Sequence, residues 1–224
     1  MRAGRSMAGD VDLLGLLSDD ARSRLLLGAR SLTLPAGSVT YSAEETVADV
    51  VESGLVRIFV RSADGRQASF AYVHAPSFYG APTILGVGMS TSAQTLTETR
   101  LLRLDARHMA TLFEEDLEVA KALAHVMASR ISQAARLVTV RSLGTVRERL
   151  AYDLLERASD QMLRGDASSL RVTHEELAES IGSAREVVSR ILGELRRSGV
   201  INASPGVLSV LELERLAAIV EGLI

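Results

Sequence analysis

The sequence predicts an α+β protein in which an antiparallel β-roll is followed by a long helix and a winged helix-turn-helix. Three observations predict this order. Short runs of alternating apolar and polar residues fill positions 32–104, a helical period begins after position 106, and two short helices and a hairpin lie near the C-terminus. We therefore divide the chain into a roll at 1–106, a dimerisation helix at 107–140 and a helix-turn-helix domain at 141–224.

The β-roll is predicted from runs at 38–42, 47–62, 66–75 and 92–105, which follow a short helix within residues 12–30. Asp64-Gly65 between two of these runs is a strong hairpin signal. No long helix separates the runs, which favours antiparallel pairing. Glycines and prolines interrupt the pattern at residues 77–92, where we expect a loop with one helical turn.

One face of the long helix carries an apolar stripe. Its members recur every three or four residues and are Leu117, Ala120, Ala124, Met127, Ile131, Ala134 and Val138. Small residues in the stripe suit the close packing of two helices, so we expect a homodimer that forms along it. The alternative is that the stripe packs on its own roll, but a helix of this length extends beyond what the roll can cover.

The C-terminal domain contains two short helices joined at Gly182, after a turn and strand within residues 165–172. A hairpin that turns at Pro205-Gly206 and a last helix follow them. Two pairs have the spacing of a capping box, Thr173 with Glu176 and Ser183 with Glu186. Helices and a two-stranded wing in this order are the plan of a winged helix-turn-helix.

The second short helix presents a polar face opposite its apolar side. That face consists of Arg185, Glu186, Ser189 and Arg190. An α-helix fits the major groove of DNA, where arginine binds guanine with two hydrogen bonds and glutamate accepts one from cytosine. Taken singly, each residue is better explained as solvated surface, with Arg190 paired to Glu186. The combination of capped helices, glycine turn and hairpin reverses this preference and predicts a DNA-reading helix at 183–197.

The composition narrows the classes of function. The chain of 224 residues has no cysteine, which excludes disulfides and thiolate-held zinc or iron–sulfur sites. The four histidines lack metal-ligand spacing, so we predict no metal site. The net charge is −3, so a basic surface for nucleic acid must be local to one face. No apolar run is long enough to span a membrane, and we expect a cytoplasmic protein with no membrane partner.

The segment "ELAESIGSAREVVSRILGELRRSGVI" resembles the DNA-reading part of the CRP/FNR family, the catabolite activator and fumarate-nitrate regulators. The order of roll, long helix and winged helix-turn-helix agrees over nearly the whole chain. The resemblance implies a homodimeric transcription regulator of bacterial type that binds a palindromic operator in double-stranded DNA, with RNA polymerase as a further partner. It also implies that Glu186 and Arg190 read bases, as does Arg185, while Thr173 and the helix start near Ser183 contact phosphates.

The roll resembles a cyclic-nucleotide-binding domain that has lost its polar contacts. Relatives that bind cyclic AMP carry a glycine-glutamate pair and an arginine-serine pair in the loop, and a threonine-serine pair on the helix. The same positions here read Gly80-Ala81, Thr91-Ser92 and Ala134-Ala135. We therefore expect an unknown, less charged effector, or none, in place of cyclic AMP. Arg100 or Arg103 is the candidate to replace the missing arginine, and His74 is a candidate haem ligand.

Two other classes of protein compete with a DNA reader. One is a sensor that acts through protein contacts and carries a degenerate helix-turn-helix. A test for salt-dependent binding to a palindrome would distinguish it from a DNA-binding regulator. The other is an enzyme, but the sequence has no nucleophile elbow, phosphate-binding P-loop or HExxH motif. We therefore predict that the protein is not an enzyme.

Overall fold

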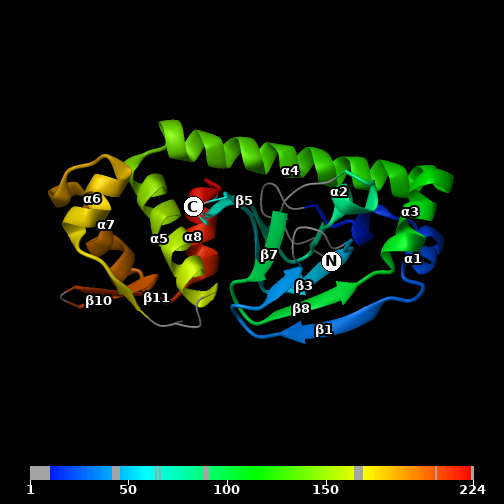
Figure 1. Cartoon of the computed structure of the whole chain (residues 1–224), viewed down its shortest axis with the longest axis horizontal. Helices are drawn as coiled ribbons and strands as arrows, with labels where there is room; N and C mark the ends of the chain where they lie inside the picture. The colour runs from blue at the N-terminus through cyan, green and yellow to red at the C-terminus, as the bar shows by residue number, and fades with distance from the viewer. Residues whose placement is uncertain are drawn as a thin grey trace. The chain divides into compact units, whose positions relative to one another are not determined.

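The computed structural model describes residues 11–41, 46–63, 65, 67–87, 91–163, 169–204 and 206–222 (Figure 1). The chain forms two compact units, Met1–Ala134 and Ala135–Ile224. Among the described residues, no helix combines the length and apolar character needed to cross a membrane.

The first unit is a roll of two antiparallel four-stranded sheets. One sheet has the order β1-β8-β3-β6 and the other β2-β7-β4-β5. Their bounds are Arg30–Leu34 (β1), Val39–Tyr41 (β2), Asp49–Ser53 (β3), Leu55–Arg61 (β4), Gln67–His74 (β5), Ser77–Tyr79 (β6), Thr91–Thr95 (β7) and Thr99–Arg103 (β8). The predicted antiparallel roll is therefore confirmed.

Helices cover one side of this roll (Figure 1). They are η1 (Leu14–Leu16), α1 (Asp19–Leu25), α2 (Ala81–Ile84), α3 (Ala106–Glu115) and α4 (Leu117–Leu143). Leu25, Met109 and Leu123 from three of the helices share a core with Val50 and Phe78 of the sheet. A second core, which includes Val51, Val56, Val73 and Ala93, joins the two sheets. Burial of these apolar side chains is the main force that holds the roll together.

Several strand predictions needed correction. The predicted run 47–62 forms two strands, because Gly54 turns the chain with a φ of +92° where a Cβ would lie 2.5 Å from the Glu98 carbonyl oxygen. β1 was not predicted, and β6 lies inside the predicted loop. α2 provides the expected helical turn. The hairpin between β4 and β5 is present, although Asp64 of its predicted turn lies outside the described residues.

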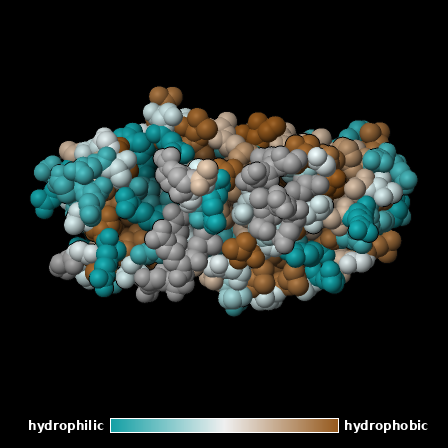
Figure 2. Space-filling model, viewed as in Figure 1, coloured by the Kyte–Doolittle hydropathy of each residue, from teal (hydrophilic) through white to brown (hydrophobic). Residues whose placement is uncertain are grey.

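Helix α4 has two apolar faces. Val119, Leu123 and Val126 are buried in the core of the first unit. The predicted stripe lies on the other side, where Leu117, Ile131 and Val138 are 69, 68 and 65% exposed. Figure 2 shows hydrophobic atoms along the upper edge of the molecule, over α4. These three members of the stripe are therefore largely uncovered, whereas Met127 of the same stripe packs against the core of the first unit.

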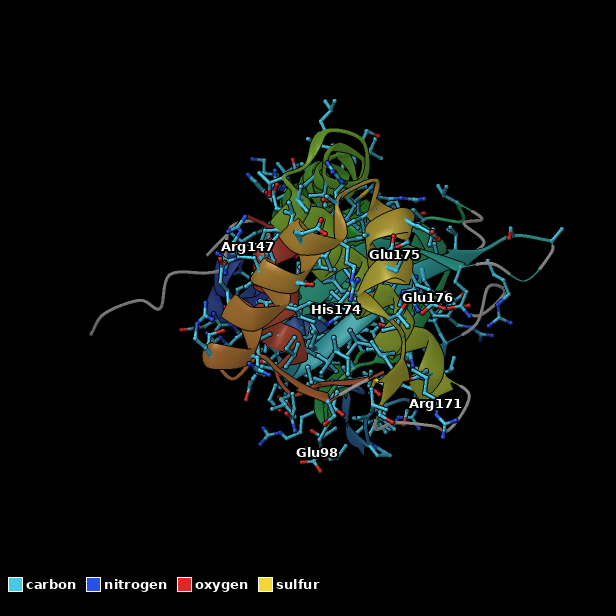
Figure 3. The ribbon with its side chains drawn as sticks, turned by 90° about the vertical axis from the view of Figure 1, so that its left-hand side faces the viewer. Glu98, Arg147, Arg171, His174, Glu175 and Glu176 are labelled. Carbon is cyan, nitrogen blue, oxygen red and sulfur yellow. The ribbon has the colours of Figure 1, made fainter. Side chains whose placement is uncertain are left out.

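The second unit contains the predicted helix-turn-helix and a wing (Figure 3). Its elements after α4 are α5 (Val146–Leu163), β9 (Leu170–Arg171), α6 (His174–Ile181), α7 (Arg185–Arg197), β10 (Ile201–Ser204), β11 (Val207–Val210) and α8 (Leu213–Val220). The wing has three strands in the order β10-β11-β9, not the two predicted, because Leu170 and Arg171 pair with Leu208 and Val207. Pro205 of the predicted turn and residues 164–168 lie outside the described residues.

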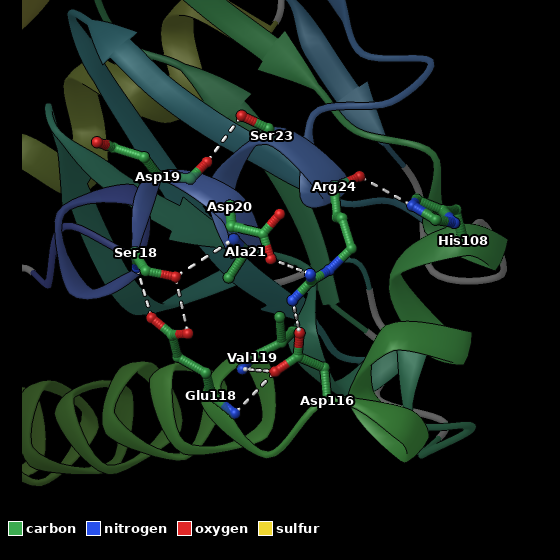
Figure 4. A network of polar contacts seen from close by, with 10 residues as sticks. All are labelled: Ser18, Asp19, Asp20, Ala21, Ser23, Arg24, His108, Asp116, Glu118 and Val119. Carbon is green, nitrogen blue, oxygen red and sulfur yellow. Dashed lines mark hydrogen bonds and ion pairs between the residues drawn. The ribbon is translucent and has the colours of Figure 1, made fainter.

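The predicted continuous helix after residue 106 breaks at Asp116, whose backbone is extended (Figure 4). The Asp116 carboxylate accepts hydrogen bonds from the backbone amides of Glu118 and Val119, 2.9 and 3.3 Å away, at the first turn of α4. The same carboxylate accepts from Arg24 Nη2 of α1 at 2.6 Å. Ser18 Oγ also donates to Glu118 at 2.9 Å, so α1 is tied to the start of α4.

Asp116→Asn should lower the free energy of unfolding at neutral pH, and the loss should shrink as the pH falls. The hydrogen bond from Arg24, with those from the amides of Val119 and Glu118, holds the pKa of Asp116 below its ordinary value. A depressed folded pKa adds stability above the unfolded pKa, and that stability disappears as the pH falls through the folded pKa. Urea titrations at a series of pH values measure this, with the exposed Glu114→Gln as control. A loss that stays constant with pH would contradict the assignment.

Candidate nucleic-acid interface and ligand cavity

Helix α6 begins with the predicted capping box. Thr173 Oγ1 accepts from the Glu176 amide at 3.1 Å, and Glu176 Oε2 accepts from the Thr173 amide at 2.7 Å. The hydrogen bonds from Thr173 hold the pKa of Glu176 below its ordinary value. Gly182 ends α6 in the left-handed conformation, with φ 61° and ψ 55°. Local sequence therefore fixes the sharp turn between α6 and α7.

The second predicted capping box, at Ser183, is wrong. Helix α7 begins at Arg185 with Ala184 at the N-cap, and among the described residues no side chain caps that end. The Ser183 amide instead donates to the Ala178 carbonyl at 2.9 Å and closes α6. Glu186 therefore has no capping role and stays exposed in the first turn of α7.

The structure brings the predicted base-reading residues together on one face of α7. Arg185, Glu186 and Arg190 are exposed and Ser189 is half-buried. The opposite face of the helix is the buried set Val188, Ile191, Leu192 and Leu195. Arg190 pairs with Glu194 at 2.9 Å, not with Glu186, and an exposed pair of this kind contributes at most about 1 kcal/mol. Its guanidinium can therefore exchange this partner for another acceptor.

The start of α6 lies beside this face. His174 Nδ1 is 2.7 Å from Ser189 Oγ, and His174 is exposed (Figure 3). A hollow of about 310 Å³ next to it is lined by Thr173, His174, Glu175 and Arg185 and by residues of the wing. Local spacing does not predict the contact between His174 and Ser189, because the two residues are 15 positions apart. The interface therefore includes the first turns of both helices.

The first unit contains a partly open cavity of about 250 Å³ between its strands and α4. The lining residues are Tyr41, Ile58, Phe70, Phe78, Tyr79, Gly80, Ala81, Pro82, Val87, Thr91, Val126, Met127, Arg130 and Ile131. Of the predicted pocket residues, Gly80, Ala81 and Thr91 are present in this set. Ser92 is absent from it because it follows Thr91 on β7 and points to the other face of the strand. The predicted Ala134 and Ala135 lie further along α4 than the described residues that line the cavity.

Gly80 is required by the backbone at the edge of this cavity. Its φ is +110°, and a Cβ there would lie 2.0 Å from the carbonyl oxygen of Val47. No L side chain fits such a close approach of two backbone segments. The glycine therefore has a structural explanation that needs no ligand.

Two tyrosines form a polar part of the cavity wall, and both are hydrogen-bonded to the protein. Their rings stack with centroids 5.9 Å apart. The Tyr41 hydroxyl lies 3.1 Å from Thr91 Oγ1, and the Tyr79 hydroxyl donates to Asp49 Oδ2 at 2.9 Å. Burial raises the pKa of Tyr41, and burial with the nearby Asp49 charge raises that of Tyr79 well above its ordinary value. Both tyrosines are therefore neutral phenols.

Both parts of the chain match known protein families. Residues 148–219 match the model of a Crp-like helix-turn-helix domain, and residues 31–116 match that of a cyclic nucleotide-binding domain. The chain is 32% identical over 175 residues to the cyclic AMP receptor protein of Thermus thermophilus, covering 78% of this chain and 79% of that protein. The chain belongs to the CRP/FNR family. It is a DNA-binding transcription regulator of that family.

Other relatives agree with this assignment. Transcriptional regulator LdrP of Thermus thermophilus is 34% identical over 153 residues, which cover 67% of this chain and 75% of the relative. A solved CRP/FNR-family regulator from Eubacterium rectale has a TM-score of 0.61 at 21% identity, over 94% of this chain and 98% of that one. At that identity the second likeness supports the fold alone.

Arg130 is the charged residue among the cavity-lining residues that were not predicted from the sequence. Its Nη2 donates to Ser77 Oγ at 2.6 Å and to the Phe78 carbonyl at 3.0 Å, and its Nη1 donates to Gln133 Oε1 at 2.5 Å. These bonds hold a positive guanidinium in the cavity wall. The sequence carries no local signal for this role, because an arginine on an amphipathic helix has the same spacing whether it is solvated or lines a cavity.

The arginines predicted to replace the missing one lie elsewhere. Arg100 pairs with Glu52 at 3.4 Å, and Arg103 pairs with Asp49 at 2.8 Å, so neither lines the cavity. His74, the candidate haem ligand, is buried at the end of β5. In the described part of the chain, no group of three or more His, Asp or Glu residues could hold a metal ion.

Proposed function

We propose that this regulator binds as a homodimer to an inverted repeat, with one α7 in each of two major grooves. The observation that carries the proposal is the exposed polar face of α7, which stands opposite a fully buried apolar face. Glu186 and Arg190 would contact base edges, with Arg185 and Ser189 beside them. Thr173 and Ser183 would contact phosphates near the two helix starts.

The apolar stripe of α4 supports the homodimer. Leu117, Ile131 and Val138 are each about two-thirds exposed, although the opposite side of the same helix is buried. Exposed apolar residues in a continuous row mark a protein interface. Two-fold symmetry of such a dimer would place two copies of α7 on the two half-sites of a palindrome. RNA polymerase would be the further partner of a regulator of this kind.

Arg190→Ala should weaken specific DNA binding by about 1–3 kcal/mol and relax the base preference at one position of the half-site. Its side chain is 65% exposed on the polar face of α7, so the loss would come from DNA contact and not from the fold. Mobility-shift titrations against a set of base-substituted palindromes measure this. Arg197→Ala, at the far end of the same helix, is the control and should weaken binding equally on every sequence. If Arg190→Ala lowered the affinity equally for every palindrome, Arg190 would be a phosphate contact and not a base contact.

A sensor that acts only through protein contacts is the other function to test. The mobility-shift assay decides between them when it is repeated at several salt concentrations. A DNA reader neutralises phosphates and so loses affinity steeply as salt rises. A chain that shows no preference for a palindrome over random DNA would support the protein-contact function.

We further propose that the cavity is the effector site and that cyclic AMP is not its ligand. The name of one relative, cyclic AMP receptor protein, and the charge of Arg130 favour cyclic AMP as a second candidate. The positions of the cyclic AMP contacts nevertheless read Ala81, Thr91, Ala134 and Ala135. Ribose and adenine would lose polar partners on entering an apolar cavity, and such desolvation costs several kcal/mol.

Cyclic AMP and cyclic GMP should therefore show no binding below roughly millimolar concentration, which corresponds to about 4 kcal/mol of binding free energy. Isothermal calorimetry on the purified protein measures this directly. Micromolar binding that also tightens operator affinity would show that the cavity works as a cyclic nucleotide site.

A further inference from the structure

We propose that the cavity binds a small, mainly apolar molecule that carries a single acidic group, and that Arg130 holds this group. The inference rests on the proposal that the cavity is an effector site, and it names the chemical class of the effector. Three features of the described residues carry it: the volume of the cavity, the hydrogen bonding of its wall and the position of one charge.

The volume limits the size of the ligand. A protein cavity of about 150 Å³ with apolar walls binds benzene. The cavity of about 250 Å³ therefore has room for a molecule of roughly ten non-hydrogen atoms. A cyclic nucleotide has roughly twice that number and would extend beyond this volume.

The side chains of the cavity wall indicate that the ligand is mainly apolar. Ile58, Phe70, Phe78, Val126 and Met127 supply aliphatic and aromatic surface. The hydroxyls in the wall are already hydrogen-bonded, Tyr41 to Thr91 and Tyr79 to Asp49. A ligand with several polar groups would have to break these bonds or leave its own groups unpaired, and either outcome weakens binding. An apolar body avoids both.

The charge of Arg130 indicates that the ligand carries an acidic group. It is the one charged residue among the described residues that line the cavity. Ser77 Oγ and the Phe78 carbonyl hold its guanidinium in the wall, 2.6 and 3.0 Å away. A carboxylate suits the planar guanidinium, because its charge-assisted hydrogen bonds are stronger than those that Arg130 makes to the neutral Ser77 hydroxyl and Phe78 carbonyl. A single acid at one end of an apolar body therefore matches both the charge and the walls.

The test compares two probes with the same body, 4-phenylbutanoate and 4-phenylbutan-1-ol, by isothermal calorimetry on the full chain without DNA. We expect the acid to bind at least about tenfold more tightly than the alcohol. Equal affinities, no binding of either probe, or tighter binding of cyclic AMP than of the acid would overturn the proposal. The outcome is independent of DNA reading, which the mobility-shift assay reports on the same preparation.

Variants identify the groups involved. Arg130→Gln should remove the preference for the acid and leave binding of the alcohol unchanged, whereas Lys121→Gln on the exposed side of α4 should change neither. Arg130→Lys keeps the charge and should keep a reduced preference, which covers the case in which Arg130→Gln fails to fold. Met127→Trp fills the cavity and should weaken both probes. An unchanged preference in Arg130→Gln would remove Arg130 from the site.

Discussion

Ala134→Glu should convert the proposed homodimer into monomers and abolish tight operator binding. Ala134 lies half-exposed in the apolar stripe of α4, between Ile131 and Val138. In a dimer that packs along this stripe, two symmetry-related copies of the new carboxylate would be buried close together. Each unpaired buried charge costs several kcal/mol, which weakens the association of the two helices strongly. Operator affinity should fall by orders of magnitude, because both half-sites must be held at once.

Sedimentation velocity at several protein concentrations measures the first effect, and mobility-shift titration measures the second. Ser132→Glu is the matched control, since Ser132 is exposed on α4 but lies away from the stripe. It adds the same charge to the same helix and should leave the dimer intact. A dimer that survives Ala134→Glu would mean that the stripe is not the interface.

Asp49→Ala should lower the free energy of unfolding of the roll by about 3–5 kcal/mol. Asp49 is fully buried, and both of its carboxylate oxygens accept from Arg103 at 2.8 Å. It also accepts from the hydroxyl of Tyr79 at 2.9 Å. Removing the carboxylate leaves a largely buried guanidinium and a phenol without their acceptor. The loss is therefore far larger than that of a surface pair.

Chemical denaturation followed by tyrosine fluorescence gives the unfolding free energy. Glu52→Ala is the control on the same strand, because Glu52 pairs with Arg100 in a partly exposed position. We expect it to cost less than about 1 kcal/mol. Similar losses from the two variants would show that burial of the Asp49 pair adds nothing.

The elements that depend on neighbouring residues in the chain, most strands of the roll and the turn of the helix-turn-helix, were predicted from the sequence. Alternation of apolar residues gave the strands of the roll, and Thr173 with Gly182 gave the turn of the helix-turn-helix. The elements that were not predicted are those whose formation depends on contacts between distant parts of the chain. β6 is only three residues long and forms by pairing with β3. The break at Asp116 has no proline or glycine to mark it, and Arg24 stabilises it from a position 92 residues away.

The polar face of α7 could be predicted from neighbouring residues in the chain, whereas the cavity could not. The exposed polar face of α7 follows from helical period alone, so all four of its predicted residues lie together. The cavity is assembled from Tyr41, Thr91 and Arg130, which come from separate segments of the chain. A lone arginine on an amphipathic helix has the same local pattern as a solvated one, and only the packed roll shows that it lines a cavity.

The uncapped start of α7 has a consequence for how the protein meets its operator. The first amides of an α-helix point outward with no acceptor in their own helix. Among the described residues, no side chain supplies one at Ala184. A phosphate oxygen placed there would accept hydrogen bonds from these amides, and its negative charge would be stabilised by the positive end of the helix dipole. In that arrangement the DNA backbone would take the position of a capping residue, and the start of α7 would gain its cap only in the complex.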